Sequence, residues 1–380
     1  MGIKWQIKKK QKNKWKRYAG LIHLWLGLLS GIIVFIMATT GCIYVFHDEI
    51  KDLVYDWRFV EEQNQSLVNP SLVFSTVKEA YPEAFANMVV YNGPKRPGLV
   101  YVQLDGVPHN VYFNPYSAKI THVQNLDTDF FMIIEELHRF LLLPETIGKQ
   151  ITGVATIIFL MMLVTGLILW FPKQTKSLVK HFVVKWKAKW KRINYDVHRV
   201  SGIYILLPAA VIAITGLSFS YEWMHESFYA VGNAFEDEKN ILEIPEFKPS
   251  LEKKTTSEAL DKALQKTFAL LPESGMAFIW DQGSGLPVLT GAYPETLYFD
   301  HQSNFYFDCV SGELLYSQLY DNKNLGMQLQ EMNYGLHTGQ FFNLAGKIIA
   351  FVVSLLVAML PVTGVLIWYG RHKKAKFKPL

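Results

Sequence analysis

The stretch HLWLG at residues 23–27 opens a long apolar run that ends at Thr40-Gly41. The same frame recurs as HRVSG at residues 198–202, an apolar run and Thr215-Gly216. In both copies the glycine follows the histidine by four residues and the threonine follows it by seventeen. Residues four apart share one helical face. Each frame therefore predicts a helix that carries an imidazole and a small residue side by side.

A second frame also occurs twice, and each copy opens with Leu-His. One copy has His138, Gly148 and TGLILW at residues 165–170, and the other has His337, Gly346 and TGVLIW at residues 363–368. In both copies eighteen residues separate the first glycine from the glycine of the Thr-Gly pair. The chain is therefore interpreted as two fused halves. The Thr-Gly pairs are expected to serve helix packing, with each threonine bonded back to its own helix.

The apolar runs are long enough to cross a lipid bilayer, which takes roughly 20 residues of helix. They lie near residues 20–46, 148–171, 200–222 and 346–369, and half of the chain's 380 residues are hydrophobic. This pattern predicts an α-helical integral membrane protein with four transmembrane helices and the lipid bilayer as its partner. The proline at position 208 is expected to kink the third span, because it frees a carbonyl from the helix ladder.

The distribution of charge predicts the orientation. Residues 1–17, 173–199 and 371–380 hold 22 of the 38 lysines and arginines but only one of the 33 acidic residues. Basic flanks stay in the cytoplasm, so both termini and the central loop are expected inside and both long inserts outside. The two halves are then parallel repeats. Because the basic tracts adjoin spans, they are attributed to topology and not to nucleic-acid binding.

Each long insert has the size of a small folded domain and combines one helical pattern with several β-strand patterns separated by turns. Both are therefore expected to be small α+β domains. The predicted order is a basic tail at 1–19, a span at 20–47, an outer domain at 48–136, a histidine segment with the second span at 137–172, a basic loop at 173–197, a span at 198–223, a second outer domain at 224–335, a histidine segment with the fourth span at 336–370 and a tail at 371–380.

A turn motif links the two inserts, since FDCVSGEL at residues 307–314 aligns without gaps on FNPYSAKI at residues 113–120. Together with the two histidine frames, this pattern resembles the PepSY-associated transmembrane family over nearly the whole chain. The resemblance implies PepSY-like domains in the periplasm of a Gram-negative bacterium. The best-understood activity in that family is reduction of ferric siderophores at the inner membrane through bound b-type haem.

Histidines of facing helices can ligate haem iron, and ionisable residues within spans are usually functional. The repeat pairs His23 with His198 as ligands of one iron, and His138 with His337 as ligands of a second. Each of these histidines has an alternative interpretation as an interfacial residue bonded to a headgroup or a carbonyl. The remaining candidates are His47 and His225, which would replace or supplement a ligand of the second iron, and Arg139 and Arg199, which would pair with haem propionates.

The chain is thus predicted to be a haem-dependent electron-transfer protein, with one or two haem b groups, that reduces a ferric siderophore or another iron chelate. The sequence carries no nicotinamide, flavin or P-loop motif, so the donor is expected to be a quinol or a cytoplasmic reductase. Two alternatives remain open. One is a binding or regulatory membrane protein without redox activity, and the other is a transporter subunit.

Overall fold

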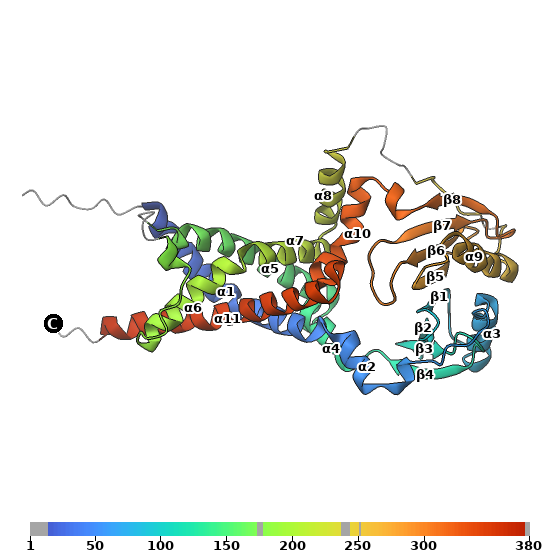
Figure 1. Ribbon diagram of the computed structural model, residues 1–380, viewed down its shortest axis with the longest axis horizontal. Helices are drawn as coiled ribbons and strands as arrows, with labels where there is room; N and C mark the ends of the chain where they lie inside the picture. Colours follow the sequence, from blue (N-terminus) through green and yellow to red (C-terminus); the bar gives the residue numbers. More distant parts are fainter. Residues whose placement is uncertain (1–13, 173–177, 237–243, 251, 377–380) are drawn as a thin grey trace, which may run out of the picture. The chain divides into compact units, whose positions relative to one another are not determined.

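The computed structural model describes residues 14–172, 178–236, 244–250 and 252–376 (Figure 1). The first part of the predicted basic tail and part of the central loop lie outside these residues. The chain forms two compact units. The helical unit takes its described residues from Met1–Cys42, His138–Ser220 and Phe351–Leu380, and the sheet unit takes them from Ile43–Leu137 and Tyr221–Ala350.

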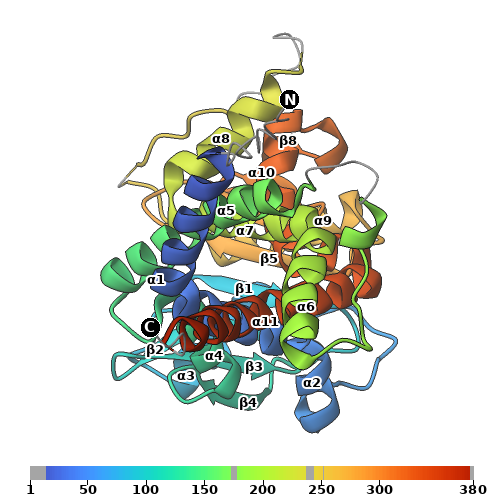
Figure 2. The ribbon, with the colours of Figure 1, turned by 90° about the vertical axis from the view of Figure 1, so that its left-hand side faces the viewer.

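The helical unit is built from long apolar helices that run along one another (Figures 1 and 2). Three helices are long and apolar enough to cross a membrane, and a bent pair makes a fourth if it is counted as one span. The chain is therefore a multi-pass membrane protein. The elements are α1 (Lys14–Tyr44), α5 (Glu145–Trp170), η3 (Val179–His181), α6 (Trp190–Tyr204), α7 (Leu206–Ser220) and α11 (Asn343–Lys376).

The bent pair is α6 and α7, whose axes differ by 64°. Pro208 has no backbone N–H to give to the carbonyl of Tyr204, four residues earlier. The helix breaks at that carbonyl, because α6 ends at Tyr204 and α7 begins at Leu206. The expected kink in the third span is confirmed, and it lies one turn before the proline.

Small residues let the helices of this unit pack closely. Val34 and Ala38 of α1 share one buried cluster with Ala209 and Ala213 of α7 and with residues of α5 and α11. A Cβ placed on Gly31 would lie 3.4 Å from Pro361, so α1 and α11 meet at that glycine. The glycine-bearing face of the first span is therefore a packing surface, as its spacing indicates.

Steric crowding explains why the second frame begins with a glycine in both copies. A Cβ on Gly148 would lie 2.1 Å from the carbonyl oxygen of Phe140, and one on Gly346 would lie 2.1 Å from that of Gly339. In each half the chain reverses direction just before α5 or α11, and its backbone packs directly against the first turn of that helix. No other residue fits there, because even the smallest side chain would overlap the carbonyl.

The sheet unit contains a single eight-stranded antiparallel sheet with the strand order β4-β3-β2-β1-β5-β6-β7-β8 (Figure 1). The two inserts are thus not separate in the way the sequence suggests, because their sheets are continuous. Val89 of β1 pairs with Ile279 of β5 at the junction. The pairing covers an edge of each four-stranded half, and a bare edge favours aggregation. The strands are β1 (Met88–Tyr91), β2 (Gly98–Leu104), β3 (Val107–Phe113), β4 (Ile120–Asn125), β5 (Met276–Asp281), β6 (Val288–Tyr293), β7 (Ser303–Phe307) and β8 (Leu314–Gln318).

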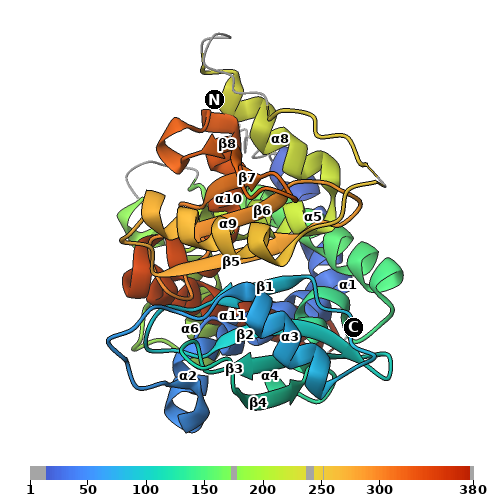
Figure 3. The same cartoon turned by 90° about the vertical axis from the view of Figure 1, so that its right-hand side faces the viewer.

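Helices α3 (Pro70–Ala80) and α9 (Ser257–Leu270) lie on one face of this sheet (Figure 3). Their buried residues, such as Val73 and Leu264, share one core with Phe113 and Phe307, which are fully buried. Each such apolar side chain contributes roughly 1.5–3 kcal/mol on burial. The remaining elements of the unit are α2 (His47–Val54), η1 (Asp56–Arg58), α4 (Phe130–Phe140, which continues into the helical unit), α8 (Glu222–Asn233), η5 (Tyr320–Asn322), α10 (Leu325–Thr338) and η6 (Gln340–Phe342).

Candidate functional site

His23 rests on the Thr-Gly pair of the second span. Its Nδ1 lies 3.0 Å from Oγ1 of Thr165, and a Cβ on Gly166 would lie 3.3 Å from its Cε1. The threonine thus holds one corner of the imidazole, and the adjacent glycine makes room for the next atom of the ring. We call this arrangement a Thr-Gly seat.

The hydrogen bonds of the threonine fix the tautomer of the imidazole. Oγ1 of Thr165 lies 3.0 Å from the carbonyl oxygen of Met161 and 3.1 Å from that of Met162. Carbonyl oxygens only accept, so the hydroxyl proton is used within the helix. Oγ1 must then accept from His23, which places the imidazole proton on Nδ1 and leaves the lone pair on Nε2. A neutral imidazole in this state is a metal ligand.

The second half of the chain repeats the seat. Nδ1 of His198 lies 2.8 Å from Oγ1 of Thr363, and a Cβ on Gly364 would lie 3.5 Å from its Cε1. The Thr363 hydroxyl donates to the carbonyls of Met359 and Leu360, at 2.9 Å and 3.0 Å. His198 therefore also carries its proton on Nδ1 and directs an unprotonated Nε2 away from the seat.

The two seated imidazoles lie next to each other in an edge-to-face arrangement. The ring centroids of His23 and His198 are 6.2 Å apart, and the ring planes are at 89°. Among the described residues, none hydrogen-bonds to Nε2 of either ring. A bond from a metal to an imidazole nitrogen is about 2.0–2.1 Å, so one ion between two imidazoles sets their centroids roughly 6 Å apart. The structure thus brings together the first pair of histidines that the repeat predicts.

His138 occupies a third seat. Its Nδ1 lies 3.1 Å from Oγ1 of Thr40 and 2.9 Å from the carbonyl oxygen of Met37, and a Cβ on Gly41 would lie 3.5 Å from its Cε1. The carbonyl can only accept, so Nδ1 of His138 is protonated too. His337, its predicted partner, belongs to α10 of the sheet unit. The pairing of these two residues stays a prediction from the repeat.

The sequence interpretation of the Thr-Gly pairs was incomplete. Thr40, Thr165 and Thr363 do bond back to their own helices, as expected. Each of them also accepts from a histidine of another helix, which was not expected. The two repeat frames could have indicated this contact, because each frame contains one histidine and one Thr-Gly pair. The histidine of one frame and the Thr-Gly pair of another together form a seat.

The two arginines that follow candidate ligands have other contacts. Nη2 of Arg199 lies 3.0 Å from a carboxylate oxygen of Asp196, which is fully buried, and it also donates to the carbonyl of Lys180. The guanidinium of Arg139 lies 4.7 Å from the centroid of the Phe140 ring. Pairing of either arginine with a propionate stays a prediction.

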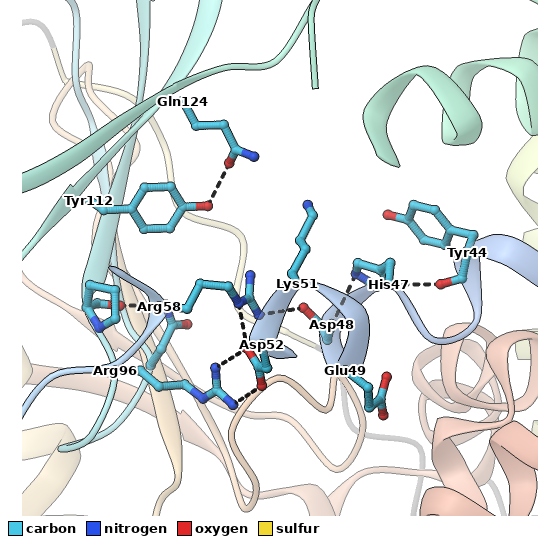
Figure 4. A network of polar contacts seen from close by, with 12 residues as sticks. Tyr44, His47, Asp48, Glu49, Lys51, Asp52, Arg58, Arg96, Tyr112 and Gln124 are labelled. Atoms are coloured by element: carbon cyan, nitrogen blue, oxygen red, sulfur yellow. Dashed lines mark hydrogen bonds and ion pairs between the residues drawn. The ribbon is translucent and has the colours of Figure 1, made fainter. Parts of the chain in front are cut away.

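His47 lies in a polar network of the sheet unit, which Figure 4 shows. Its Nδ1 is 2.8 Å from the carbonyl oxygen of Tyr44, and its Nε2 is 3.3 Å from Asp48. Its ring also stacks on that of Tyr44 at 4.2 Å. Its Nδ1 donates to a carbonyl and its Nε2 lies beside a carboxylate, so this histidine has the surroundings of a structural residue. His225, on α8, has an exposed side chain.

The rest of the network is a chain of ion pairs around α2 (Figure 4). Arg58 donates to Asp52 at 2.5 Å and to Asp48 at 2.9 Å, and Arg96 donates to both oxygens of Asp52. Burial favours a raised pKa for Asp52, but the hydrogen bonds from Arg96 and Arg58 outweigh it and hold the pKa below its usual range. The network fixes α2 to the first half of the sheet.

A haem needs only two protein ligands, whereas a clustered metal site needs more. Within the described part of the chain, no group of three or more His, Cys, Asp or Glu residues converges. A porphyrin supplies the remaining iron ligands itself, so two imidazoles suffice. The unprotonated Nε2 atoms and the centroid separation of His23 and His198 fit such a group.

Comparison with known proteins agrees with this architecture. The family model described as "PepSY-associated TM region" matches residues 21–371, which extend from the first span to the last and include both inserts. A comparison with curated proteins gave no significant match. Because the matched segment covers most of its length, the chain belongs to the PepSY-associated TM region family.

Proposed function

We propose that this protein is a haem-dependent electron carrier of the bacterial inner membrane that reduces ferric chelates, such as siderophore complexes. The observation that carries the proposal is the pair of seated imidazoles, His23 and His198, at 6.2 Å. Bound between them, haem b supplies a one-electron Fe(III)/Fe(II) couple. His138 offers a third imidazole in the same tautomer for a second haem.

The residues around the pair have defined tasks. Thr165 and Thr363 hold the Nδ1 protons, so that both Nε2 atoms stay available as ligands. A hydrogen bond at Nδ1 also raises the basicity of Nε2 and orients the ring. The site lies among the apolar helices of the helical unit, and a low dielectric and restricted solvent access tune a redox potential.

The excess of lysine and arginine supports an orientation in which both termini are cytoplasmic. The sheet unit then lies in the periplasm, where a ferric chelate is the proposed substrate. One-electron reduction converts Fe(III) to Fe(II), which hard oxygen donors hold less tightly, and the ion leaves the chelate. The donor is a quinol or a cytoplasmic reductase.

A visible spectrum of the purified protein, before and after dithionite, tests the proposal. We expect the bands of a low-spin b-type haem and a positive pyridine haemochrome assay. The variants His23→Ala and His198→Ala should each lose the haem that this pair holds, whereas His109→Ala should not, because that histidine lies on β3 of the sheet unit. Protein that is folded, supplied with haem during expression and still free of haem absorbance would refute the proposal.

A further inference from the structure

A half-open cavity of about 190 Å³ lies between α6 and α11, and its lining residues fall within 190–195 of α6 and 366–371 of α11. Its apolar lining residues are Trp190, Tyr195, Leu366 and Ile367, of which all but Ile367 are exposed. The guanidinium groups of Arg192 and Arg199 lie 5.6 Å and 5.7 Å from the centroid of the Tyr195 ring. Small-molecule pockets usually measure roughly 300–1,000 Å³. This cavity therefore suits one planar ring and not an entire large ligand.

The polar residues that line the cavity indicate which substituents a bound ring would have. Asn194 contributes an amide, and Lys191 and Arg371 contribute cations. Among the described residues that line it, none is a carboxylate. A ligand with hydrogen-bonding oxygens on an aromatic ring satisfies both the walls and these groups, whereas a cationic ligand does not.

The cavity adjoins the seat of His198. Asn194 donates from its Nδ2 to the carbonyl oxygen of Thr363 at 3.1 Å, and Oγ1 of the same threonine accepts from His198. On α6, Asn194 precedes His198 by one turn, and on α11, Gly370 follows Thr363 by two turns. These steps correspond to about 6–11 Å along the helix axes. A ring in the cavity would lie close to the imidazole that we propose as a haem ligand.

We infer that this cavity binds the headgroup of a lipid-soluble quinol, the electron donor of the protein; the inference rests on the proposed function. The aromatic and aliphatic walls hold the ring, and the amide of Asn194 and the ammonium of Lys191 bind its oxygens. Oxidation of one quinol to the quinone releases two electrons and two protons. The electrons pass singly to two ferric haem irons, or to one iron in two successive turnovers, and the protons enter water.

Anionic phospholipid is the competing occupant, because Lys191 and Arg371 would attract its phosphate. A phosphate gains nothing from contact with the aromatic residues Trp190 and Tyr195. Phosphate binding would also leave the contact between Asn194 and the seat of His198 without a role. The sequence also lacks a nicotinamide or flavin motif, so the helical unit needs a donor that arrives from outside. These observations favour the quinol.

The variant Gly370→Leu tests the cavity with little risk to folding. A Cβ at Gly370 would lie 4.0 Å from the flexible side chain of Lys191, which is an ordinary contact, and leucine is a better helix former than glycine. The larger side chain fills the cavity. Val365→Leu is the matched control, because Val365 lies on the same helix and is exposed, and it is not part of the wall.

Two measurements separate this inference from the proposed function. In the first, a decyl-benzoquinone with an azido group is photolysed with the full-length protein, and the labelled peptides are mapped. We expect labelling of residues 190–195 and 366–371 in the wild type and the control, and at least a tenfold loss in Gly370→Leu. Labelling elsewhere, or displacement by phosphatidylglycerol but not by phosphatidylcholine, overturns the inference.

In the second measurement, decyl-benzoquinol and dithionite are compared as reductants of the haem. We expect Gly370→Leu to slow reduction by the quinol at least tenfold while dithionite still reduces the haem fully. Equal quinol rates in Gly370→Leu and wild type overturn the quinol site and leave the haem proposal standing. Absence of haem refutes the proposed function, and the photolabelling still decides what the cavity binds.

Discussion

Oγ1 of Thr363 accepts a hydrogen bond from Nδ1 of His198 at 2.8 Å, because its own proton is committed to the carbonyls of the preceding turn. The Thr363 hydroxyl thus donates to carbonyls of its own helix and also accepts from a histidine on another helix. By accepting at Nδ1 it fixes the tautomer of that histidine, and we call this role a tautomer lock. The same relation joins Thr165 to His23. It gives the repeated Thr-Gly pairs a chemical role in addition to their packing role.

Replacing Thr363 by valine keeps the shape of the side chain but removes the acceptor. The Nδ1 proton of His198 then loses this acceptor and keeps only the backbone carbonyl of Leu360, so the ring is held less firmly and its basicity changes. Loss of such an outer partner typically weakens binding of the ligated metal by about 10–100-fold. Haem titration of the purified Thr363→Val protein measures this. Thr363→Ser retains the oxygen and should bind haem like the wild type; a valine variant with unchanged affinity and redox potential would contradict the lock.

The two glycines of the seats should differ in their tolerance of alanine. A Cβ on Gly166 would lie 3.3 Å from Cε1 of His23, whereas one on Gly364 would lie 3.5 Å from Cε1 of His198. Gly166→Ala must therefore displace its imidazole slightly, and Gly364→Ala need not. Both changes favour the helix by roughly 0.5–1 kcal/mol. We expect a shifted haem spectrum or potential for Gly166→Ala only, without loss of thermal stability. Equal spectra in the two variants would argue against close contact at His23.

Arg58 should be a main stabilising residue of the network around α2. It is 8% exposed, and its removal leaves the carboxylates of Asp48 and Asp52 without their shared partner. Breaking a buried pair typically costs about 3–5 kcal/mol, and the partial exposure of Asp52 places the expected loss for Arg58→Ala near the lower end. Lys95→Ala removes only an exposed pair with Glu62 and should cost less than about 1 kcal/mol. Hydrogen exchange in α2 and η1 measures the difference.

His47 should make the sheet unit less stable in mild acid. Burial holds its pKa below the usual 6.5, against the attraction of Asp48 and the carbonyl of Tyr44, and Lys51 and Lys347 also lower it. The unfolded chain therefore binds a proton at a higher pH than the folded chain does. This contribution to stability is present above about pH 6.5 and declines as the pH falls through it.

Denaturant unfolding of the full-length protein at about pH 7.5 and about pH 5.5 checks this sign. The wild type should lose stability between the two, and His47→Asn, which does not titrate, should lose less. A steeper acid loss in His47→Asn than in the wild type would show that the histidine is protonated in the folded protein.

Much of the fold follows from periodicity and charge. The apolar runs mark the spans, because few other structures satisfy the backbone in lipid, and Pro208 marks the bend in the third one. The continuous sheet was not predictable in this way. The pattern of each insert predicts a complete small α+β domain. The residues of β1 and β5 do not indicate that these two strands pair with each other, because the same residues would suit strands at the edges of two separate sheets.

The sequence by itself determined that the protein spans a membrane, that its two halves repeat and that His23 and His198 correspond. Local patterns suffice for those conclusions, because hydropathy and spacing are properties of neighbouring residues. Only the tertiary structure decided which groups meet. It placed each of the three seated histidines on the Thr-Gly pair of a different helix and set two imidazoles 6.2 Å apart. These contacts join residues at least 98 positions apart, so they depend on how the helices pack, and no local pattern encodes that.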